Sequence, residues 1–202
     1  MTSHLEPQFR DPHIKGSVVR SAKEWIIKTY GEELFHRALA AIPKEMRDTI
    51  QGEVLSVGWY PLTTWTTFMD SVRREVKRTT GEDADEFDRR NIFEAGKNTV
   101  IKVYRFVLGF FDPATAVDKI LPVLRRIYSH GDIKLISHDP GRLVVRFDEA
   151  PLSMQTEVTK QFPLSCEFML HVASQRVTNV RPTLRTEGSR FSLELEIQYK
   201  KA

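Results

Sequence analysis

The expected fold is decided by residues 85–111, which read DEFDRRNIFEAGKNTVIKVYRFVLGFF. Apolar and small residues recur in this stretch at steps of three and four, the spacing of one helix face. A helix with so narrow a polar edge lies inside a layer of other elements. We therefore expect a buried central helix over Asp85–Phe111. Its apolar stripe contains Phe93, Gly96, Val100, Tyr104, Val107 and Phe111, widened by Ile92, Ile101, Val103 and Leu108, and its polar edge is Asn98, Lys102 and Arg105.

The composition is that of a globular domain. The 202 residues are 41% hydrophobic and 28% charged, enough for one substantial core in a single domain. The longest apolar run, Phe106–Phe111, is far too short to cross a bilayer, and the N-terminus lacks the apolar segment of a signal peptide. We expect a cytoplasmic protein with no membrane span. The single cysteine, Cys166, excludes an internal disulfide framework and a thiolate zinc cluster.

The charge pattern does not indicate nucleic-acid binding. Thirty basic residues are nearly balanced by 27 acidic ones, and the net charge is only +3. Nucleic-acid sites combine basic side chains with exposed aromatic rings, whereas here the periodicity places aromatic residues inward. We interpret the basic clusters as solvated faces, the last of them neighboured by Glu194 and Glu196 across the strands. They are Arg73, Arg74, Lys77 and Arg78; Arg125 and Arg126; and Arg181, Arg185 and Arg190.

The first two thirds of the chain predict helices. Residues 1–16 have no periodicity and are predicted to be a flexible arm, followed by a single domain over residues 17–202. A helical pattern from Ser21 is interrupted at Gly31, and further helices are predicted from Pro43, Pro61 and Pro113, the last reaching about Ser129 with a bend at Pro122. The acidic run 82–88 precedes the central helix, so we interpret it as a helix cap and solvated face rather than a paired-carboxylate active site.

The last third changes to the period of two that is typical of strands. Residues 133–137 and 143–147 predict a hairpin, residues 161–175 a helix, and residues up to Tyr199 a second hairpin with its turn at Gly188-Ser189. This second register places Arg181 opposite Glu196 on the outer face. The predicted class is α+β, a helical N-terminal subdomain followed by a four-stranded antiparallel ββαββ sheet. The core-face pairs of that hairpin are Val180 with Ile197 and Leu184 with Leu193.

This order of elements resembles a superfamily of ligand-binding domains. It contains the haem-nitric-oxide-binding (H-NOX) domains, the vinyl-reductase-type sensor domains and the small TRAPP vesicle-tethering subunits. Within it, a paralogous myxobacterial family of unknown function is most similar, and the resemblance covers residues 16–199. It implies a bacterial protein with an H-NOX/TRAPP-like pocket fold. The segments that carry the resemblance are Tyr30-Gly31-Glu32-Glu33, Trp59-Tyr60-Pro61 and the helix through Gly96 and Tyr104-Arg105.

The sequence departs from these families where their cofactors bind. The H-NOX resemblance implies a proximal histidine on the helix ahead of the sheet and a Tyr-x-Ser-x-Arg triplet for the haem propionates. Residues 113–129 contain no histidine, His130 follows only at their end, and the triplet is absent. The vinyl-reductase-type resemblance implies several cysteines for zinc, whereas Cys166 stands alone. We therefore expect no cofactor and no metal.

The aromatic residues are the better candidates for a site. Several aromatic residues lie on helices or helix ends that this fold packs around one cavity. We predict that they bind a ligand, although they could instead fill the core. The TRAPP resemblance implies that Cys166 could hold an acyl chain, whereas most buried free cysteines act as small hydrophobes. The predicted ligand-binding residues are Trp59, Tyr60, Trp65, Tyr104, Phe111 and Cys166.

No catalytic arrangement is apparent. His130 and His138 flank the first strand of the sheet and His171 lies beside the apolar stripe of the next helix, but two histidines alone do not make a metal site. We expect a non-catalytic sensory or scaffold module that binds a small hydrophobic ligand in the helix–sheet cavity and signals to a protein partner without haem. The alternative is a protein-interaction domain, a homodimer included, whose cavity is filled by its own side chains.

Overall fold

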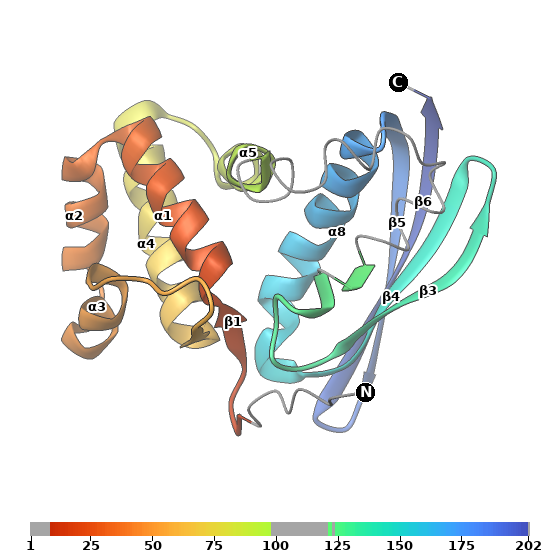
Figure 1. The fold of residues 1–202 in the computed structure, drawn as a ribbon, viewed down its shortest axis with the longest axis horizontal. Helices are drawn as coiled ribbons and strands as arrows, with labels where there is room; N and C mark the ends of the chain where they lie inside the picture. The colour runs from red at the N-terminus through yellow and green to blue at the C-terminus, as the bar shows by residue number, and fades with distance from the viewer. Residues whose placement is uncertain (1–8, 98–120, 123, 202) are drawn as a thin grey trace.

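A computed structural model describes residues 9–97, 121–122 and 124–201. Helices form one half of the molecule, and a four-stranded antiparallel sheet covered by one long helix forms the other (Figure 1). The predicted α+β class with a ββαββ C-terminal part is confirmed. Within the described residues, no helix has the length and apolar character needed to cross a membrane.

Four helices pack together in the N-terminal half: α1 (Gly16–Tyr30), α2 (Glu32–Ala40), α3 (Lys44–Gln51) and α4 (Leu62–Thr80). The predicted break between the first two is confirmed at Gly31, whose φ of 87° lies in the region that favours glycine. The hydroxyl of Ser71 on α4 donates a hydrogen bond of 2.9 Å to the carbonyl of Ala38 on α2. This contact requires the two helices to approach closely.

A short two-stranded sheet lies at the base of these helices. Strand β1 (His13–Lys15) pairs antiparallel with β2 (Trp59–Pro61), and Ile14 also forms a β-bridge with Tyr128. Ile14 is buried in the core. Residues 13–15 were expected in the flexible arm, and that expectation is wrong for them because their partner strand is 44 or more residues away in the chain, beyond the reach of a local pattern.

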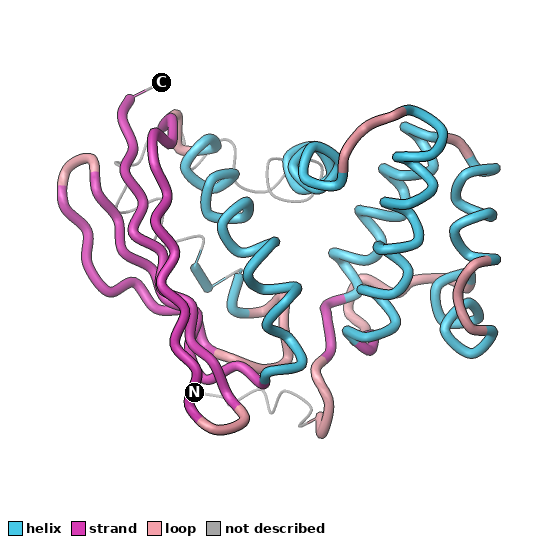
Figure 2. Tube along the Cα trace, turned by 180° about the vertical axis from the view of Figure 1, so that it is seen from behind, coloured by secondary structure: helices cyan, strands magenta, loops and turns pink. Residues whose placement is uncertain are grey.

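Helix α5 (Ala84–Gly96) lies between the two halves of the molecule (Figures 1 and 2). Its start agrees with the predicted cap, because the Asp83 carboxylate accepts a hydrogen bond of 2.9 Å from the Glu86 amide. The predicted central helix continued to Phe111, but residues 98–111 lie outside the described residues. The buried face also differs from the predicted stripe: Phe93 is only half-buried. The buried residues are Phe87, Asp88, Asn91 and Ala95.

The sheet has the strand order β3-β4-β6-β5. Its strands are β3 (Asp132–Asp139), β4 (Arg142–Pro151), β5 (Gln175–Glu187) and β6 (Arg190–Lys201). Both predicted hairpins are confirmed. The predicted register of the second hairpin is confirmed at all three pairs, Val180–Ile197, Arg181–Glu196 and Leu184–Leu193.

Two details of this hairpin differ from the prediction. Leu184 is 44% exposed and not in the core, because the β5–β6 turn reaches past the end of the covering helix (Figure 1). The glutamates of β6 form ion pairs with arginines of β4: Arg142 lies 2.9 Å from Glu196 and Arg146 lies 3.6 Å from Glu194. The neighbouring strand β4 lies on the other side of β6, where the sequence did not indicate a partner.

Helix α8 (Gln155–Val172) covers one face of the sheet and follows a 3-10 turn, η2 (Leu152–Met154). It starts six residues before the predicted Gln161, and Pro163 lies inside it. The Thr and Val residues of its first turns have low helix propensity, and packing overrides that preference. The helix predicted to reach Ser129 is helical at residues 121–122 and 124–125 and has ended by residue 126.

Comparing Gly131 with Gly81 measures what the close approach of the Phe147 ring to Gly131 contributes to the cost of a substitution there. Both have positive φ, 82° and 79°, but a Cβ at Gly131 would lie 2.2 Å from Cε1 of Phe147, whereas one at Gly81 meets nothing within 4 Å. We expect Gly81→Ala to lower the free energy of unfolding by about 1 to 2 kcal/mol, and Gly131→Ala to lower it by about 1 to 3 kcal/mol more because of overpacking. Urea unfolding followed by circular dichroism measures both, and equal losses would contradict this account.

Candidate functional site

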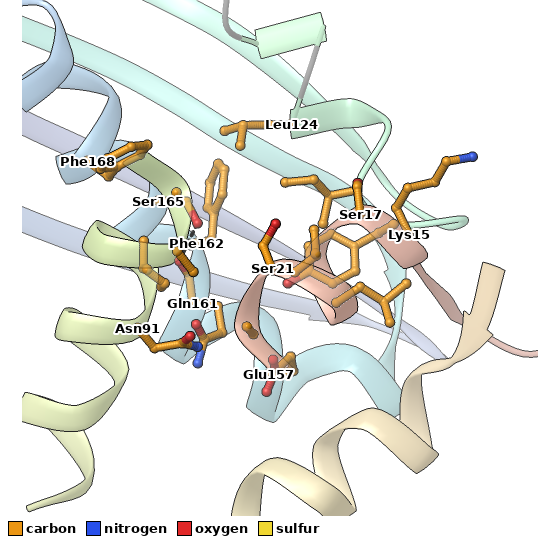
Figure 3. A pocket seen from close by; sticks show the side chains of 18 of the residues that line it. Lys15, Ser17, Ser21, Asn91, Leu124, Glu157, Gln161, Phe162, Ser165 and Phe168 are labelled. Carbon is orange, nitrogen blue, oxygen red and sulfur yellow. Dashed lines mark hydrogen bonds between the residues drawn. The ribbon is translucent and has the colours of Figure 1, made fainter. Parts of the chain in front are cut away.

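A cavity of about 390 Å³ lies between α1, α4, α5 and α8, where the helical half meets the sheet half (Figure 3). Its volume is within the range of small-molecule sites, and most of its surface is apolar. The described residues that line it are Ile14, Lys15, Ser17, Val18, Ser21, Ala22, Trp65, Met69, Asn91, Ile92, Ala95, Gly96, Leu124, Arg126, Ile127, Tyr128, Ile133, Glu157, Gln161, Phe162, Ser165, Phe168 and Met169.

The helices place their lining side chains at steps of about four residues. On α8, Glu157, Gln161 and Ser165 follow one another at this spacing and therefore share one face. On α1, Ser17 and Ser21 do the same. Each helix therefore brings polar groups into a wall that is otherwise apolar.

The polar groups from α5 and α8 meet at one end of the cavity. Figure 3 shows Asn91, Gln161 and Glu157 near one another, on the opposite side from Leu124. Asn91 and Glu157 are each 7% exposed, and the Asn91 Oδ1 atom is buried with no hydrogen-bond partner. Because a buried polar atom without a partner costs free energy, this end of the cavity is suited to a polar group from outside the chain.

Glu157 has an unusual ionisation. Burial raises the pKa of its carboxyl to about 7; Arg73 and Lys160 oppose the rise, and Asp88 and Asp70 add to it. The group is therefore partly protonated near neutral pH. It also borders a second, smaller cavity of about 190 Å³, which Arg73 and Lys160 help to line.

A buried ion pair lies behind this polar end. The Arg73 Nε atom of α4 donates a hydrogen bond of 2.8 Å to Oδ1 of Asp88 on α5, and Arg73 Nη1 donates one of 2.7 Å to Asp70. Arg73 and Asp88 are 7% and 3% exposed, so their prediction as parts of solvated faces is wrong. Each satisfies the charge of the other, which allows burial at positions where the sequence shows only a basic and an acidic run.

Of the predicted ligand-binding aromatics, Trp65 lines the cavity. Trp59 and Tyr60 lie on strand β2 and are not among the lining residues, so their role in ligand binding stays a prediction. The Lys15 ammonium lies 4.3 Å from the centroid of the Trp59 ring, and the Tyr60 hydroxyl accepts a hydrogen bond of 2.9 Å from the Leu55 amide. Both contacts stabilise the β1–β2 region.

For the other three predicted ligand-binding residues, the described part of the chain shows no position at the cavity wall. Tyr104 and Phe111 lie outside the described residues. Cys166 is fully buried, but it is not among the described residues that line the cavity. Burial raises the pKa of its thiol above the ordinary range, so it stays protonated. The possible acylation of Cys166 stays a prediction.

The histidines weighed above have separate partners. His130 Nδ1 lies 2.8 Å from the Ser129 hydroxyl, and His138 Nε2 lies 2.6 Å from the Tyr199 hydroxyl. His171 lies against the ring of Phe93. Among the described residues, no group of three or more His, Cys, Asp or Glu side chains is arranged to hold a metal ion.

Sequence reasoning missed the polar end of the cavity. Glu157 was missed because the helix was predicted to begin at Gln161, and Asn91 because the buried face of α5 was placed on other residues. The signal that could have found Glu157 is the four-residue spacing of Glu157, Gln161 and Ser165 beside an apolar stripe. Polar residues at that spacing, in a helix buried on two sides, indicate a lined cavity.

The two halves, with α5 between them, form an H-NOX-like fold. An unliganded Fe(II) H-NOX protein from K. algicida has a TM-score of 0.66 at 11% identity, over 94% of this chain and 98% of that one. An oxygen-binding H-NOX domain related to soluble guanylate cyclases, in its oxygen complex, has a TM-score of 0.63 at 12% identity, over 93% of this chain and 96% of that one. No protein-family model and no curated protein matches the sequence.

The described lining residues do not fit a haem group. Haem iron is held in proteins by histidine, cysteine thiolate, methionine with histidine, or tyrosine. The described lining includes no histidine and no cysteine. It includes Tyr128, but burial raises the pKa of that hydroxyl beyond its ordinary range, so no phenolate forms.

The importance of the buried ion pair is tested by comparing the stability lost when each of two carboxylate partners of Arg73 is substituted. We expect Asp88→Asn to lower the free energy of unfolding by about 3 kcal/mol, because it leaves a buried guanidinium without its buried counter-charge. Asp70→Asn removes a partner whose side chain is 56% exposed, and we expect a loss below about 1 kcal/mol. Denaturant unfolding at neutral pH measures both; a larger loss for Asp70→Asn would contradict the assignment.

The raised pKa of Glu157 predicts a pH-dependent stability. A carboxyl whose pKa is higher in the folded state contributes stability below its unfolded pKa, near 4.5, and loses that contribution as the pH rises through about 7. We expect the wild type to lose about 3 kcal/mol relative to Glu157→Gln over this interval. The exposed Glu149→Gln variant is the control and should follow the wild type. Thermal unfolding across pH measures the difference, and parallel curves for wild type and Glu157→Gln would refute it.

Proposed function

We propose that this chain is a sensory module that binds a small, mainly apolar molecule in the cavity between its two halves, without haem. The observation that carries the proposal is the cavity of about 390 Å³, with apolar walls and a few polar groups gathered at one end. Ligand sites combine apolar walls with a few polar groups that fix orientation. The H-NOX-like fold supports this proposal as an analogy at the level of the fold.

The position of the cavity supports a sensory role. Its walls come from α1 and α4 of the helical half, from α5, which packs against these two helices, and from α8, which covers the sheet. A ligand that contacts Asn91 on α5 and Glu157 on α8 therefore interacts with both halves at once. Such a ligand shifts the balance between arrangements of the two halves if it binds one of them more tightly. We propose that a protein partner detects this shift.

Three further parts of the proposal rest on the sequence. The module has no catalytic activity of its own, because the sequence contains no local motif that combines a nucleophile with a base. It acts in the cytoplasm of a bacterium. The myxobacterial family of the sequence resemblance remains the predicted source. The alternative, an interaction domain or homodimer with a self-filled core, is distinguished by the mass of the native protein.

A cavity-filling variant tests ligand binding. Ala22 on α1 lines the cavity and is buried, so Ala22→Phe should place a ring in the space that a ligand needs. We expect it to weaken binding of the fluorescent probe N-phenyl-1-naphthylamine by at least about tenfold, or 1.4 kcal/mol. Val57→Phe, at a residue that is 79% exposed, adds the same ring at the surface and should bind like the wild type.

Native mass spectrometry and an absorption spectrum of the purified wild type complete this test. Bound small-molecule mass, or probe binding lost only in Ala22→Phe, supports the proposal. A Soret band would overturn its haem-free part. A ligand-free dimer that binds no probe would favour the interaction domain.

A further inference from the structure

We propose that the cavity selects an apolar amine, whose protonated nitrogen binds between the Glu157 carboxyl and the Asn91 amide oxygen. This inference rests on the proposed function and names the class of ligand for the same cavity. It is carried by the two buried acceptors at the polar end and by the charges around them.

The first observation is that hydrogen-bond acceptors at the polar end lack donors. Asn91 is 7% exposed, and its Oδ1 atom is buried without a partner. Glu157 is equally buried, and no described residue donates a hydrogen bond to its carboxyl: burial and surrounding charges alone determine its pKa. An ammonium group carries three donors and no acceptor, so it satisfies both groups at once.

The second observation is the sign of the charge. The charged groups that face Glu157 are Arg73 and Asp70 of α4, Asp88 of α5, and Lys160 of its own helix. Arg73 makes its hydrogen bonds to Asp88 and Asp70 through Nε and Nη1 rather than to Glu157, and its Nη2 atom is buried without a partner. With Glu157 ionised, the cluster of two cations and three carboxylates has one negative charge in excess. A ligand cation neutralises this excess, whereas a ligand anion enlarges it.

The other cations of the lining lie away from this end. Figure 3 shows the Lys15 side chain directed away from Glu157, and its ammonium lies against the Trp59 ring. Arg126 is exposed. They therefore leave the acidic end free to bind a cation.

The apolar part of the ligand has its own surface. Leu124, Phe162 and Phe168 form the wall away from Glu157 (Figure 3). Burial of a hydrocarbon chain there provides binding free energy that does not depend on the head group. The head group then determines selectivity, because a wrong head leaves buried polar groups unpaired.

Three compounds with one chain and different heads test the inference. Octylamine, octan-1-ol and octanoate are titrated into the full chain at neutral pH by isothermal titration calorimetry, below the concentrations at which they aggregate. We expect octylamine to bind most tightly and octanoate at least about tenfold more weakly. Glu157→Gln should reduce the affinity for octylamine to that for octan-1-ol and leave octan-1-ol unchanged. Glu149→Gln, a surface carboxylate 74% exposed, should behave as wild type.

Proton release gives a second readout that needs no variant. The ammonium favours the ionised carboxyl, so octylamine binding near pH 6 should release a proton from Glu157. Titrations in buffers of different ionisation enthalpy measure this proton, and octan-1-ol should release none. If octylamine also releases none, the amine is not held by Glu157 and the inference is overturned.

The outcomes separate the two levels of proposal. If no octyl compound and no fluorescent probe binds, the proposed function fails and the inference fails with it. If octanoate binds as tightly as octylamine, or if Glu157→Gln keeps the full preference for octylamine, the inference is overturned while ligand binding stands. Selective binding of octylamine with release of a proton supports both.

Discussion

The structure depends on the burial of α8 on two sides. One side packs on the sheet, where the ring of Phe162 meets that of Phe147 in an edge contact with centroids 5.5 Å apart. The other side faces α1 and α5 across the cavity, so Glu157 and Gln161 lie in a buried position although they are polar. Charged residues of α4 and α5, namely Arg73, Asp70 and Asp88, lie near Glu157 on this second face. The same constraint therefore holds the two halves together and creates the candidate site.

The polar end of the cavity combines an ion pair with side chains that lack hydrogen-bond partners, and the Arg73 Nη2 atom is itself among the buried atoms without one. Arg73 and Asp88 neutralise each other across α4 and α5. Asn91, which follows Asp88 by three residues on α5, and Glu157 on α8 keep unused hydrogen-bonding capacity. Such groups reduce the stability of the free protein and favour a ligand that satisfies them. Stability and binding therefore use neighbouring residues for different purposes.

An H-NOX-like fold at 11–12% identity shows that very different sequences form this architecture. The apolar periodicity of helices and strands determines how they pack, and many sequences share that periodicity. A ligand of the proposed kind would place a separate constraint on the lining residues, which is the chemistry of their contacts with it. This explains how the chain has the fold while its described lining residues do not fit haem.

The sequence by itself determined the structural features that depend only on residues close together in the chain. Alternation over residues 191–199 gave the register of the last hairpin, and Gly31 gave the break between α1 and α2, because both follow from the geometry of adjacent residues. Tertiary structure alone decided the pairing of β1 with β2, the burial of Arg73 against Asp88, and the position of Glu157 in the cavity wall. A charged residue looks the same in sequence whether it is solvated or paired, since its environment comes from elements distant in the chain.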